Sequence, residues 1–366
     1  MIGSCKICGE NNFKKIFHFK KGFFSDGNIL CTPLEKEECL NCGTLRTKTK
    51  TNLKDFYKLN YTPSRNIDTI AFSNNEEFSR SDFVFNWINE LTGCNKFTND
   101  ESLIEIGCGQ GFLLKKFKLK NKYGVEPSIS ASNSAKKIAD VRNIDFEKID
   151  NKEKYNYVLS YCVIEHIENP SVFLEKNYNI LNIDGTMIIA LPVQDKFNYD
   201  LLFADHIHHF NHNNFEKLLN KNGFEIINYQ LGKASYSNIA VYICKKNKKI
   251  DVSFNFVKNK NIENINTIIE KYKNEELYGF GYGEIAKTII PYTILDRYIL
   301  KYIDDYISSN KTINSEASKK LFKNKTVVYI ILFVNPVHSK KIKQLYEKFS
   351  NIVFLNIFEN INMETL

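Results

Sequence analysis

No hydrophobic run in the sequence is long enough to cross a membrane as a helix. The longest unbroken apolar stretch is Val327–Val334, whereas a helical span needs about 18 apolar residues. The first residues, Met1–Lys6, also lack the charged segment and the following apolar segment of a secretory signal. We therefore expect a cytoplasmic protein with no membrane partner, whose nine cysteines serve as thiols or metal ligands and form no disulfides.

Clustered basic residues are missing as well. Lys and Arg number 50 against 42 Asp and Glu, a net charge of +8, but the basic residues are scattered among Asn, Ile and Tyr. This pattern fits the compositional drift of an AT-rich genome better than a nucleic-acid-binding face. With 43% hydrophobic and 25% charged residues, the composition excludes a disordered, collagen-like or coiled-coil chain. At about 150 residues per domain, the 366 residues predict two to three domains.

Cysteines mark a first module, because five of the nine lie within the first 42 residues. Between about 44 and 81 the chain is polar and aromatic with little periodic burial, which is typical of a connecting or covering segment. From residue 82 helical and strand patterns alternate, which predicts a parallel sheet flanked by helices. Helices are expected over 83–91, 112–119, 131–139, 171–181 and 215–222, and strands over 103–106, 141–146, 157–161, 186–191, 224–229 and 238–244, with a further strand ending at 126.

After the charged tract Lys245–Ile250 the alternation restarts, with a helix expected over 262–273 and strands over 277–280, 299–303 and 326–333. The expected fold class is therefore α/β, with a central Rossmann-like domain and a second Rossmann-like domain at the C-terminus. The predicted boundaries are 1–75 for the cysteine module with its covering segment, 76–247 for the central domain and 248–366 for the last domain.

Two identical cysteine motifs predict a metal centre. Cys5-Lys-Ile-Cys8-Gly9 and Cys39-Leu-Asn-Cys42-Gly43 each read as a knuckle whose glycine lets backbone N–H groups approach the thiolates. Together they supply four sulfurs for a tetrahedral zinc ion, and such a closed site is structural. The alternative, unrelated buried cysteines, would require the two spacings and both glycines to coincide. Cys31 is left over and is expected to be an ordinary buried thiol.

A glycine-rich turn predicts a ligand site in the central domain. Glu105-Ile-Gly107-Cys-Gly109-Gln-Gly111 stands between a strand and a helix, where glycines allow a close approach of the backbone to a ligand. Glu126 ends the following strand, where a carboxylate can bind the two hydroxyls of a ribose. Nicotinamide cofactors bind to the same combination of a glycine turn and a carboxylate, so they are an alternative ligand. A purely structural turn without a ligand is a further alternative.

The segment after the next strongly predicted strand distinguishes between these possible ligands. Tyr157–Tyr161 runs into Cys-Val-Ile-Glu165-His166, and the following strand comes after Gly185 and ends near Pro192. This arrangement resembles class I S-adenosylmethionine (SAM)-dependent methyltransferases over about residues 83–245. Ser-Tyr-Cys-Val stands where base N-methylating members carry Asn/Asp-Pro-Pro-Tyr, so the resemblance is to enzymes of small molecules. In it, Glu165-His166 would serve as helix entry and site wall, with no catalytic role.

The same resemblance assigns the glycine turn. It implies that Gly107, Gly109 and Gly111 lie along the amino-acid end of SAM and that Glu126 binds the ribose. Glu105 opens the motif and is counted among the cofactor-binding residues.

Histidines gather after the fifth predicted strand, in Asp205-His206-Ile-His208-His209-Phe-Asn-His212, which holds four of the seven in the chain. Imidazole titrates near neutrality and suits proton abstraction, and a neighbouring carboxylate can fix its tautomer. His206 and His209 could share a second metal, but no carboxylate-rich or cysteine partner set accompanies them in the sequence. A histidine-rich surface loop is the remaining alternative.

The order of the modules is similar to that of the three-domain, zinc-containing sugar C-methyltransferases of deoxysugar biosynthesis. That resemblance places Asp205-His206 where the family has Glu-His, with His206 as the base that Asp205 orients and His209 in place of an aromatic wall residue. A glycine turn at 279–283 and the pair Asp304-Asp305 also match the family. Asp205 in place of Glu and His209 in place of Tyr or Phe depart from the family pattern. These departures make the expected substrate less secure than the expected cofactor.

The resulting expectation is a SAM-dependent methyltransferase with a structural zinc ion. Its substrate would be a small molecule, a nucleotide-linked keto-deoxysugar, methylated at carbon after His206 forms an enolate, with Tyr61 or His209 donating to the enolate oxygen. O- or N-methylation of a sugar or another small metabolite is the alternative. A zinc-ribbon enzyme that methylates RNA is less favoured, because the basic residues are not clustered.

Overall fold

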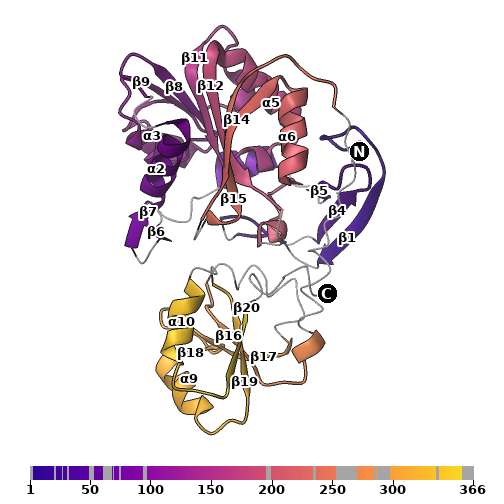
Figure 1. Ribbon diagram of the computed structural model, residues 1–366, viewed down its shortest axis with the longest axis vertical. Coiled ribbons are helices and arrows are strands. Elements are labelled where there is room, and N and C mark those ends of the chain that lie inside the picture. The colour runs from indigo at the N-terminus through magenta and orange to yellow at the C-terminus, as the bar shows by residue number, and fades with distance from the viewer. Residues whose placement is uncertain are drawn as a thin grey trace. The chain divides into compact units, whose positions relative to one another are not determined.

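A computed structural model describes residues 3–19, 22–26, 28–30, 33–48, 53–60, 68, 70–73, 76–93, 97–194, 199–233, 236–252, 270–283, 286, 297–334 and 338–356 (Figure 1). The chain folds into two compact units. The first comprises residues 1–17, 35–195 and 205–257, and the second 18–34, 196–204 and 258–366. No helix among the described residues combines the length and apolar character needed to cross a bilayer.

The N-terminal module is a small sheet that a distant segment completes. Its strands are β1 (Phe13–Phe19), β4 (Leu34–Cys39) and β5 (Leu45–Thr47), and the fourth strand is β13 (His208–His209), in the order β1-β4-β5-β13. β13 pairs antiparallel with β5, which places His208 opposite Arg46. The histidine segment is therefore the edge strand of the cysteine module.

Regular elements also occur where only a covering segment is expected. Besides β5, the described part of 44–81 contains α1 (Leu53–Asp55), a π-helical turn η1 (Phe56–Asn60) and the hairpin of β6 (Ile70–Ser73) and β7 (Glu76–Ser79). Each of these elements is too short to show a hydrophobic period within the window that a sequence pattern needs.

The central sheet has seven strands in the order β10-β9-β8-β11-β12-β15-β14. Parallel pairing joins the first five, as the alternation predicts, and the last two are antiparallel. The strands are β8 (Ser102–Ile106), β9 (Asn121–Val125), β10 (Asp140–Arg142), β11 (Tyr155–Tyr161), β12 (Leu181–Pro192), β14 (Phe224–Leu231) and β15 (Ile239–Lys246).

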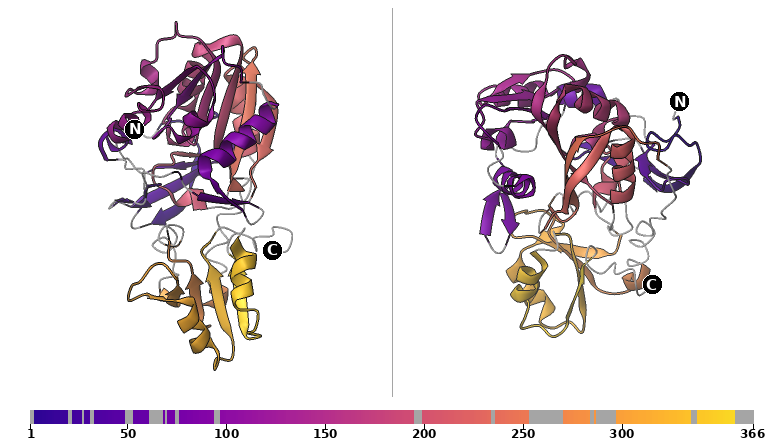
Figure 2. Two further views of the ribbon diagram at one scale, coloured as in Figure 1. Left: turned by 90° about the vertical axis from the view of Figure 1, so that its left-hand side faces the viewer. Right: turned by 45° about the horizontal axis from the view of Figure 1, so that its top comes forward.

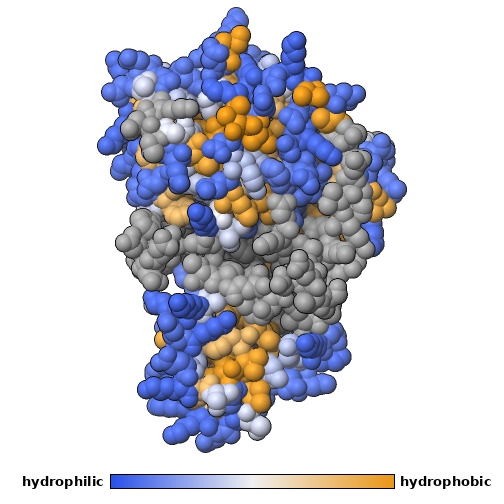
Figure 3. Space-filling model, viewed as in Figure 1, coloured by the Kyte–Doolittle hydropathy of each residue, from blue (hydrophilic) through white to orange (hydrophobic). Residues whose placement is uncertain are grey.

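Helices cover both faces of this sheet. They are α2 (Arg80–Thr92), α3 (Phe112–Lys116), α4 (Ile129–Ala135), α5 (Pro170–Ile180) and α6 (His212–Lys221). Along β12, Ile188 and Ala190 pack into the core beneath α2 and α3, whereas Met187 and Ile189 pack into the core beneath α5 and α6. α2 lies in front of the sheet in the left view of Figure 2, and hydrophilic side chains cover most of the described surface in Figure 3.

The cysteine module shares a core with the central domain. Ile7, Cys39 and Cys42 are fully buried in the same cluster as Phe210 and Phe215, which precede and line α6. Residues 1–17 and the part of the module from residue 35 onward accordingly belong to the first compact unit. The predicted domain boundaries at 75 and 247 stay predictions.

The order of the central strands creates a binding position. The chain passes from β8 to β9 on one side and later returns to β11 on the other side of β8. In open α/β sheets, ligands bind beyond the carboxyl ends of the strands at such a reversal. The glycine turn follows β8, Glu126 follows β9, and Glu165-His166 follow β11, so all three reach the same edge.

The second unit contains a parallel sheet of five strands in the order β18-β17-β16-β19-β20, with a similar reversal beside β16. Its core packs α9 (Ser315–Phe322) and α10 (Ser339–Leu345) against the sheet. The expected helix over 262–273 lies mostly outside the described residues. The strands are β16 (Leu277–Phe280), β17 (Ile299–Ile303), β18 (Thr312–Ile313), β19 (Val328–Leu332) and β20 (Ile352–Asn356).

Candidate active site and cysteine cluster

The four predicted cysteine ligands meet in one cluster. Their sulfur atoms all lie within 4.8 Å of one another, with 3.7 Å between Cys5 and Cys42 and 3.5 Å between Cys8 and Cys39. Tetrahedral zinc with Zn–S bonds of about 2.3 Å separates its sulfurs by about 3.8 Å, so the cluster fits this ion.

The two knuckles have the same backbone geometry. Gly9 N donates to Cys5 O over 2.8 Å, and Gly43 N donates to Cys39 O over 2.7 Å. Both glycines have a positive φ, 92° and 71°, a conformation that glycine adopts without strain. The sequence therefore folds each Cys-x-x-Cys-Gly motif into the same turn.

A buried amide ties this cluster to the central domain. Asn214 on α6 donates through Nδ2 to Cys42 O over 2.5 Å and to Thr44 Oγ1 over 2.9 Å. Thr44 Oγ1 in turn lies 3.2 Å from the sulfur of Cys42. Such hydrogen bonds around the ligands orient them for a metal.

The glycine turn after β8 packs tightly at Gly107 and is open at Gly109. Gly107, Gly109 and Gly111 all have positive φ, at 72°, 54° and 81°. A Cβ atom on Gly107 would lie 2.5 Å from Cγ2 of Val163, so only glycine fits there, whereas a Cβ on Gly109 would meet no atom within 4 Å. The turn thus combines tight packing at its start with open space at Gly109.

Glu126 closes the turn. Its carboxylate accepts from Gly109 N over 2.9 Å and from Ser128 N over 2.8 Å. Burial raises the pKa of Glu126, and these two N–H donors act against that rise. A carboxylate beside the turn and at the end of β9 stands where a ribose diol can bind.

Glu105 supplies an unpaired polar atom at the same place. Its Oε2 is buried and has no hydrogen-bond partner among the described residues. Burial, and then the charge of Glu126, raise the pKa of Glu105 well above its usual range. A buried acceptor without a donor is costly, so this atom favours a ligand that supplies an N–H or an ammonium group. Glu105, the glycine turn and Glu126 thus lie at the ends of the neighbouring strands β8 and β9, and their assignment to the cofactor stays a prediction.

The end of β11 has an unusual backbone. Cys162 is the one described residue other than glycine with a positive φ, 54°, and its N–H donates to Ala190 O on β12 over 2.8 Å. This turn directs Val163 against Gly107 and leads into the short helix Ile164–His166. Strained backbone of this kind is concentrated at functional sites.

His166 belongs to a polar network that sequence reasoning missed. The Tyr57 hydroxyl lies 2.6 Å from His166 Nδ1 and donates to Asp205 Oδ2 over 2.7 Å. His166 Nδ1 is also 3.0 Å from the backbone oxygen of Asp205. With its proton on Nδ1, the ring donates to both oxygens, which fixes the tautomer. Asp205, the residue predicted to orient His206, thus contacts Tyr57 and His166.

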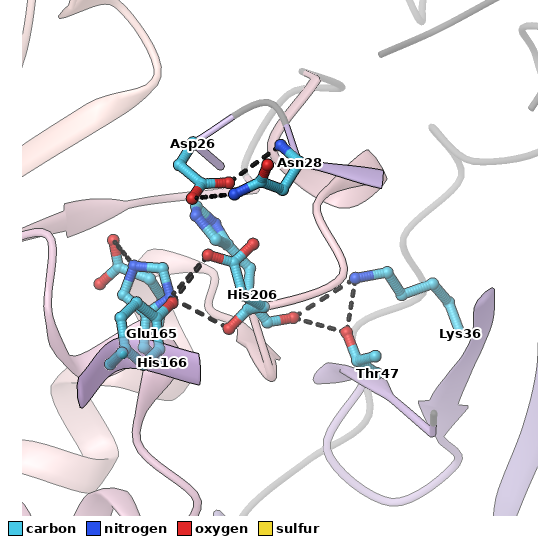
Figure 4. Close-up of polar contacts among 9 residues, drawn as sticks. Asp26, Asn28, Lys36, Thr47, Glu165, His166 and His206 are labelled. Carbon is cyan, nitrogen blue, oxygen red and sulfur yellow. Dashed lines mark hydrogen bonds and ion pairs between the residues drawn. The ribbon is translucent and has the colours of Figure 1, made fainter. Parts of the chain in front are cut away.

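His206 and His209 lie beside this network. The ring of His206 meets the edge of His166 at a centroid distance of 4.6 Å and lies 6.4 Å from that of His209. Lys36 and Thr47 of the cysteine module approach the backbone oxygen of His206 (Figure 4). The predicted catalytic residues Asp205, His206 and His209 are all buried.

Glu165 adds the carboxylate that the sequence did not show near the histidines. Ligand atoms of Glu165, His166 and His206 lie within 4.8 Å of one another, because Ile207 N donates to Glu165 O over 2.7 Å and joins the two segments. Tyr57 and Glu165 are distant from the histidine segment in sequence, so no local motif could reveal them. Tyr61 and Cys31 lie outside the described residues.

The central domain is similar to known methyltransferases. Residues 75–229 match the methyltransferase-domain family. Ubiquinone biosynthesis O-methyltransferases of Rhodopseudomonas palustris and Bradyrhizobium diazoefficiens are 32% and 33% identical over 97 residues. The match covers 24% of this chain and 38% of each relative, so the chain spans well under half of their length.

Solved methyltransferase structures also resemble this chain. A mitomycin 7-O-methyltransferase aligns at 14% identity with a TM-score of 0.39, covering 46% of this chain and 54% of its own. A magnesium protoporphyrin IX methyltransferase of Synechocystis with bound SAM aligns at 15% identity with a TM-score of 0.36, covering 45% and 77%.

The cysteine cluster predicts about one zinc ion per purified chain. Cys39→Ser should lower the zinc content at least several-fold, because one of four ligands is lost, as measured by elemental mass spectrometry. Cys244→Ala is the matched control, since Cys244 is buried on β15 outside the cluster. Equal zinc content in both variants would contradict the assignment.

Glu126→Ala should weaken binding of S-adenosylhomocysteine about 10- to 100-fold by calorimetry, because hydrogen bonds to a charged group contribute about 1.5–3 kcal/mol. Glu147→Ala removes an exposed carboxylate of the same domain and should leave the affinity within twofold. An unchanged affinity for Glu126→Ala would exclude the ribose contact.

His208 predicts a pH-dependent stability. Burial lowers its pKa from 6.5 to about 4, against the hydrogen bond with Glu168 O. The unfolded chain binds this proton more tightly, so the free energy of unfolding falls by about 3 kcal/mol as the pH drops from 6.5 to 4. His208→Gln keeps an N–H donor and should flatten the slope in urea titrations followed by the fluorescence of Trp87. Parallel slopes for the two proteins would contradict this.

Proposed function

We propose that this chain is a SAM-dependent methyltransferase that methylates a carbon atom next to a ketone, in a nucleotide-linked keto-deoxysugar. The observation that carries the proposal is the group formed by Asp205, His206 and His209, which are buried, and by the half-buried His166, which follows β11. A base and a hydrogen-bond donor side by side are what enolate chemistry needs.

The cofactor site rests on the matched domain and on the fit described above. Glu126 would bind the ribose hydroxyls, the turn from Gly107 to Gly111 would follow the amino-acid end, and Glu105 would accept from its ammonium group. Bound SAM supplies an electrophilic methyl group, so the protein needs only a base, alignment and stabilisation of the enolate oxygen.

In the proposed reaction, His206 accepts the proton from the carbon next to the ketone. Asp205 and Tyr57 hold His166 in one tautomer against the His206 ring, which restricts how that ring can turn. Electron density from the broken C–H bond moves to the ketone oxygen, where His209 would donate a hydrogen bond. The new C–C bond then forms at the methyl carbon as its bond to sulfur breaks.

The cysteine cluster would hold a structural zinc ion, because four sulfurs leave no open coordination position. Its role is to keep β4 and β5 in place, and through β5 the histidine strand β13. Chemistry at the ketone would not involve this ion.

The second unit supports a nucleotide-linked acceptor. Gly281 follows β16 with a φ of 88°, and Asp304 follows β17 and accepts from Tyr282 N over 2.8 Å. This repeats the relation between Gly109 and Glu126, so the unit has the features of a second Rossmann-like nucleotide fold.

O-methylation is the second candidate, favoured by the similarity to the ubiquinone biosynthesis O-methyltransferases. There the same histidine would take a proton from a hydroxyl group. The two candidates differ in D2O without SAM, where only an enolate-forming enzyme exchanges the hydrogen next to the ketone of a nucleoside diphosphate 4-keto-6-deoxysugar.

His206→Asn should lower methyl transfer to that sugar nucleotide at least 100-fold, because general-base catalysis contributes about 10²–10⁴-fold. Affinity for S-adenosylhomocysteine should stay within twofold. His212→Gln is the control, because His212 stacks on Tyr242 at the start of α6 outside the histidine group. Retained transfer and retained deuterium exchange in His206→Asn would refute the role of this base.

A further inference from the structure

Lys36 is a fully buried lysine in the cysteine module. It lies on β4 three residues before Cys39 and pairs with Thr47 of β5, with 0% of its surface exposed. Lysine is almost never fully buried unless it is paired, because removing an ammonium group from water is costly. This position therefore has a specific set of partners.

Thr47, His206 and His209 are among the partners of its amino group. Lys36 Nζ donates to Thr47 Oγ1 over 2.6 Å and to the backbone oxygen of His206 over 3.3 Å, and lies 2.8 Å from His209 Nε2. Thr47 Oγ1 also donates to the same oxygen of His206 over 2.5 Å (Figure 4). One side chain thus reaches both histidines of the candidate site from a different module.

We propose that Lys36 is a positioning residue that anchors the backbone of His206 and holds His209 in the neutral Nδ1–H tautomer. An ammonium group has three donors and no acceptor, so the nearby Nε2 of His209 accepts, and the ring proton is on Nδ1.

This arrangement gives the two histidines different contacts with Lys36. His209 accepts from Lys36 through Nε2, which leaves its Nδ1–H as a hydrogen-bond donor, whereas His206 is held through its backbone oxygen. The positioning role rests on the proposed function, but the contact between Lys36 and His209 does not.

The contact is tested in the zinc-loaded full chain with ¹⁵N-labelled histidine. Long-range ¹H–¹⁵N spectra, assigned by the signal lost in His209→Gln, should show the Nδ1–H form of His209 in the wild type. Lys36→Met keeps the aliphatic stem and removes every donor, so the Nε2–H form should become populated. An Nε2–H form in the wild type, or an unchanged tautomer in Lys36→Met, overturns the proposal.

The positioning role is tested by methyl transfer to the nucleoside diphosphate 4-keto-6-deoxysugar. Lys36→Met should lower kcat about 100-fold, the scale expected for a shift of about 1 Å in a reacting group. Zinc content and affinity for S-adenosylhomocysteine should stay within twofold of the wild type. Lys15→Met is the matched control, because Lys15 lies in the same module and forms a surface ion pair with Glu35. A kcat within twofold of the control overturns the role.

Thr47→Val keeps the test decisive if Lys36→Met does not fold. It removes one donor to His206 but leaves Lys36 beside His209, so kcat should fall about 10-fold while the Nδ1–H tautomer persists. An unchanged kcat overturns the anchoring of His206. A wild type without methyl transfer to this sugar nucleotide would refute the proposed function alone, since the tautomer measurement needs no substrate.

Discussion

The antiparallel pairing of β5 with β13 is the constraint on which the candidate site depends. Two residues of the central domain, His208 and His209, complete a sheet whose other strands belong to the cysteine module. Thr47 N donates to Ile207 O over 2.8 Å, and Ile207 N donates to Glu165 O over 2.7 Å. The histidine segment is thereby fixed between the cysteine cluster on one side and the end of β11 on the other.

The cofactor side is built on a different principle. There the reversal of strand order beside β8 opens space at one sheet edge, and the glycine turn and Glu126 occupy it. Because these groups sit at the ends of adjacent parallel strands, a rigid sheet sets their positions. The acceptor side instead depends on a short strand pair and on hydrogen bonds between segments that are distant in the chain.

This difference explains what could be predicted from the sequence. The knuckles around Cys5 and Cys39 and the turn at Gly107 are local motifs, so their spacing alone indicates their geometry. The central helices and strands were predicted with shifted bounds, because β12 begins at Leu181 in register with Tyr155, ahead of its most apolar part. The presence of a methyltransferase domain also agrees with the family match.

The network around the histidines could not be predicted in the same way. Tyr57 lies in a π-helical turn of five residues and reaches Asp205 across 148 positions of sequence. In the sequence Lys36 looks like an ordinary strand lysine, and only its burial and its contacts with Thr47, His206 and His209 show otherwise. Contacts of this kind leave no periodic pattern, so a single sequence contains no signal for them.

The same strand pair has a consequence for biosynthesis. During translation, residues 45–47 leave the ribosome long before residues 208–209. The edge strand β5 of the nascent N-terminal sheet therefore lacks its pairing strand β13 until most of the central domain has been made. Unpaired strand borders recruit other chains. The charged residues opposite one another in this sheet, Arg46 and Glu37, form a buried ion pair at 2.6 Å and give the early sheet a polar element that discourages such association.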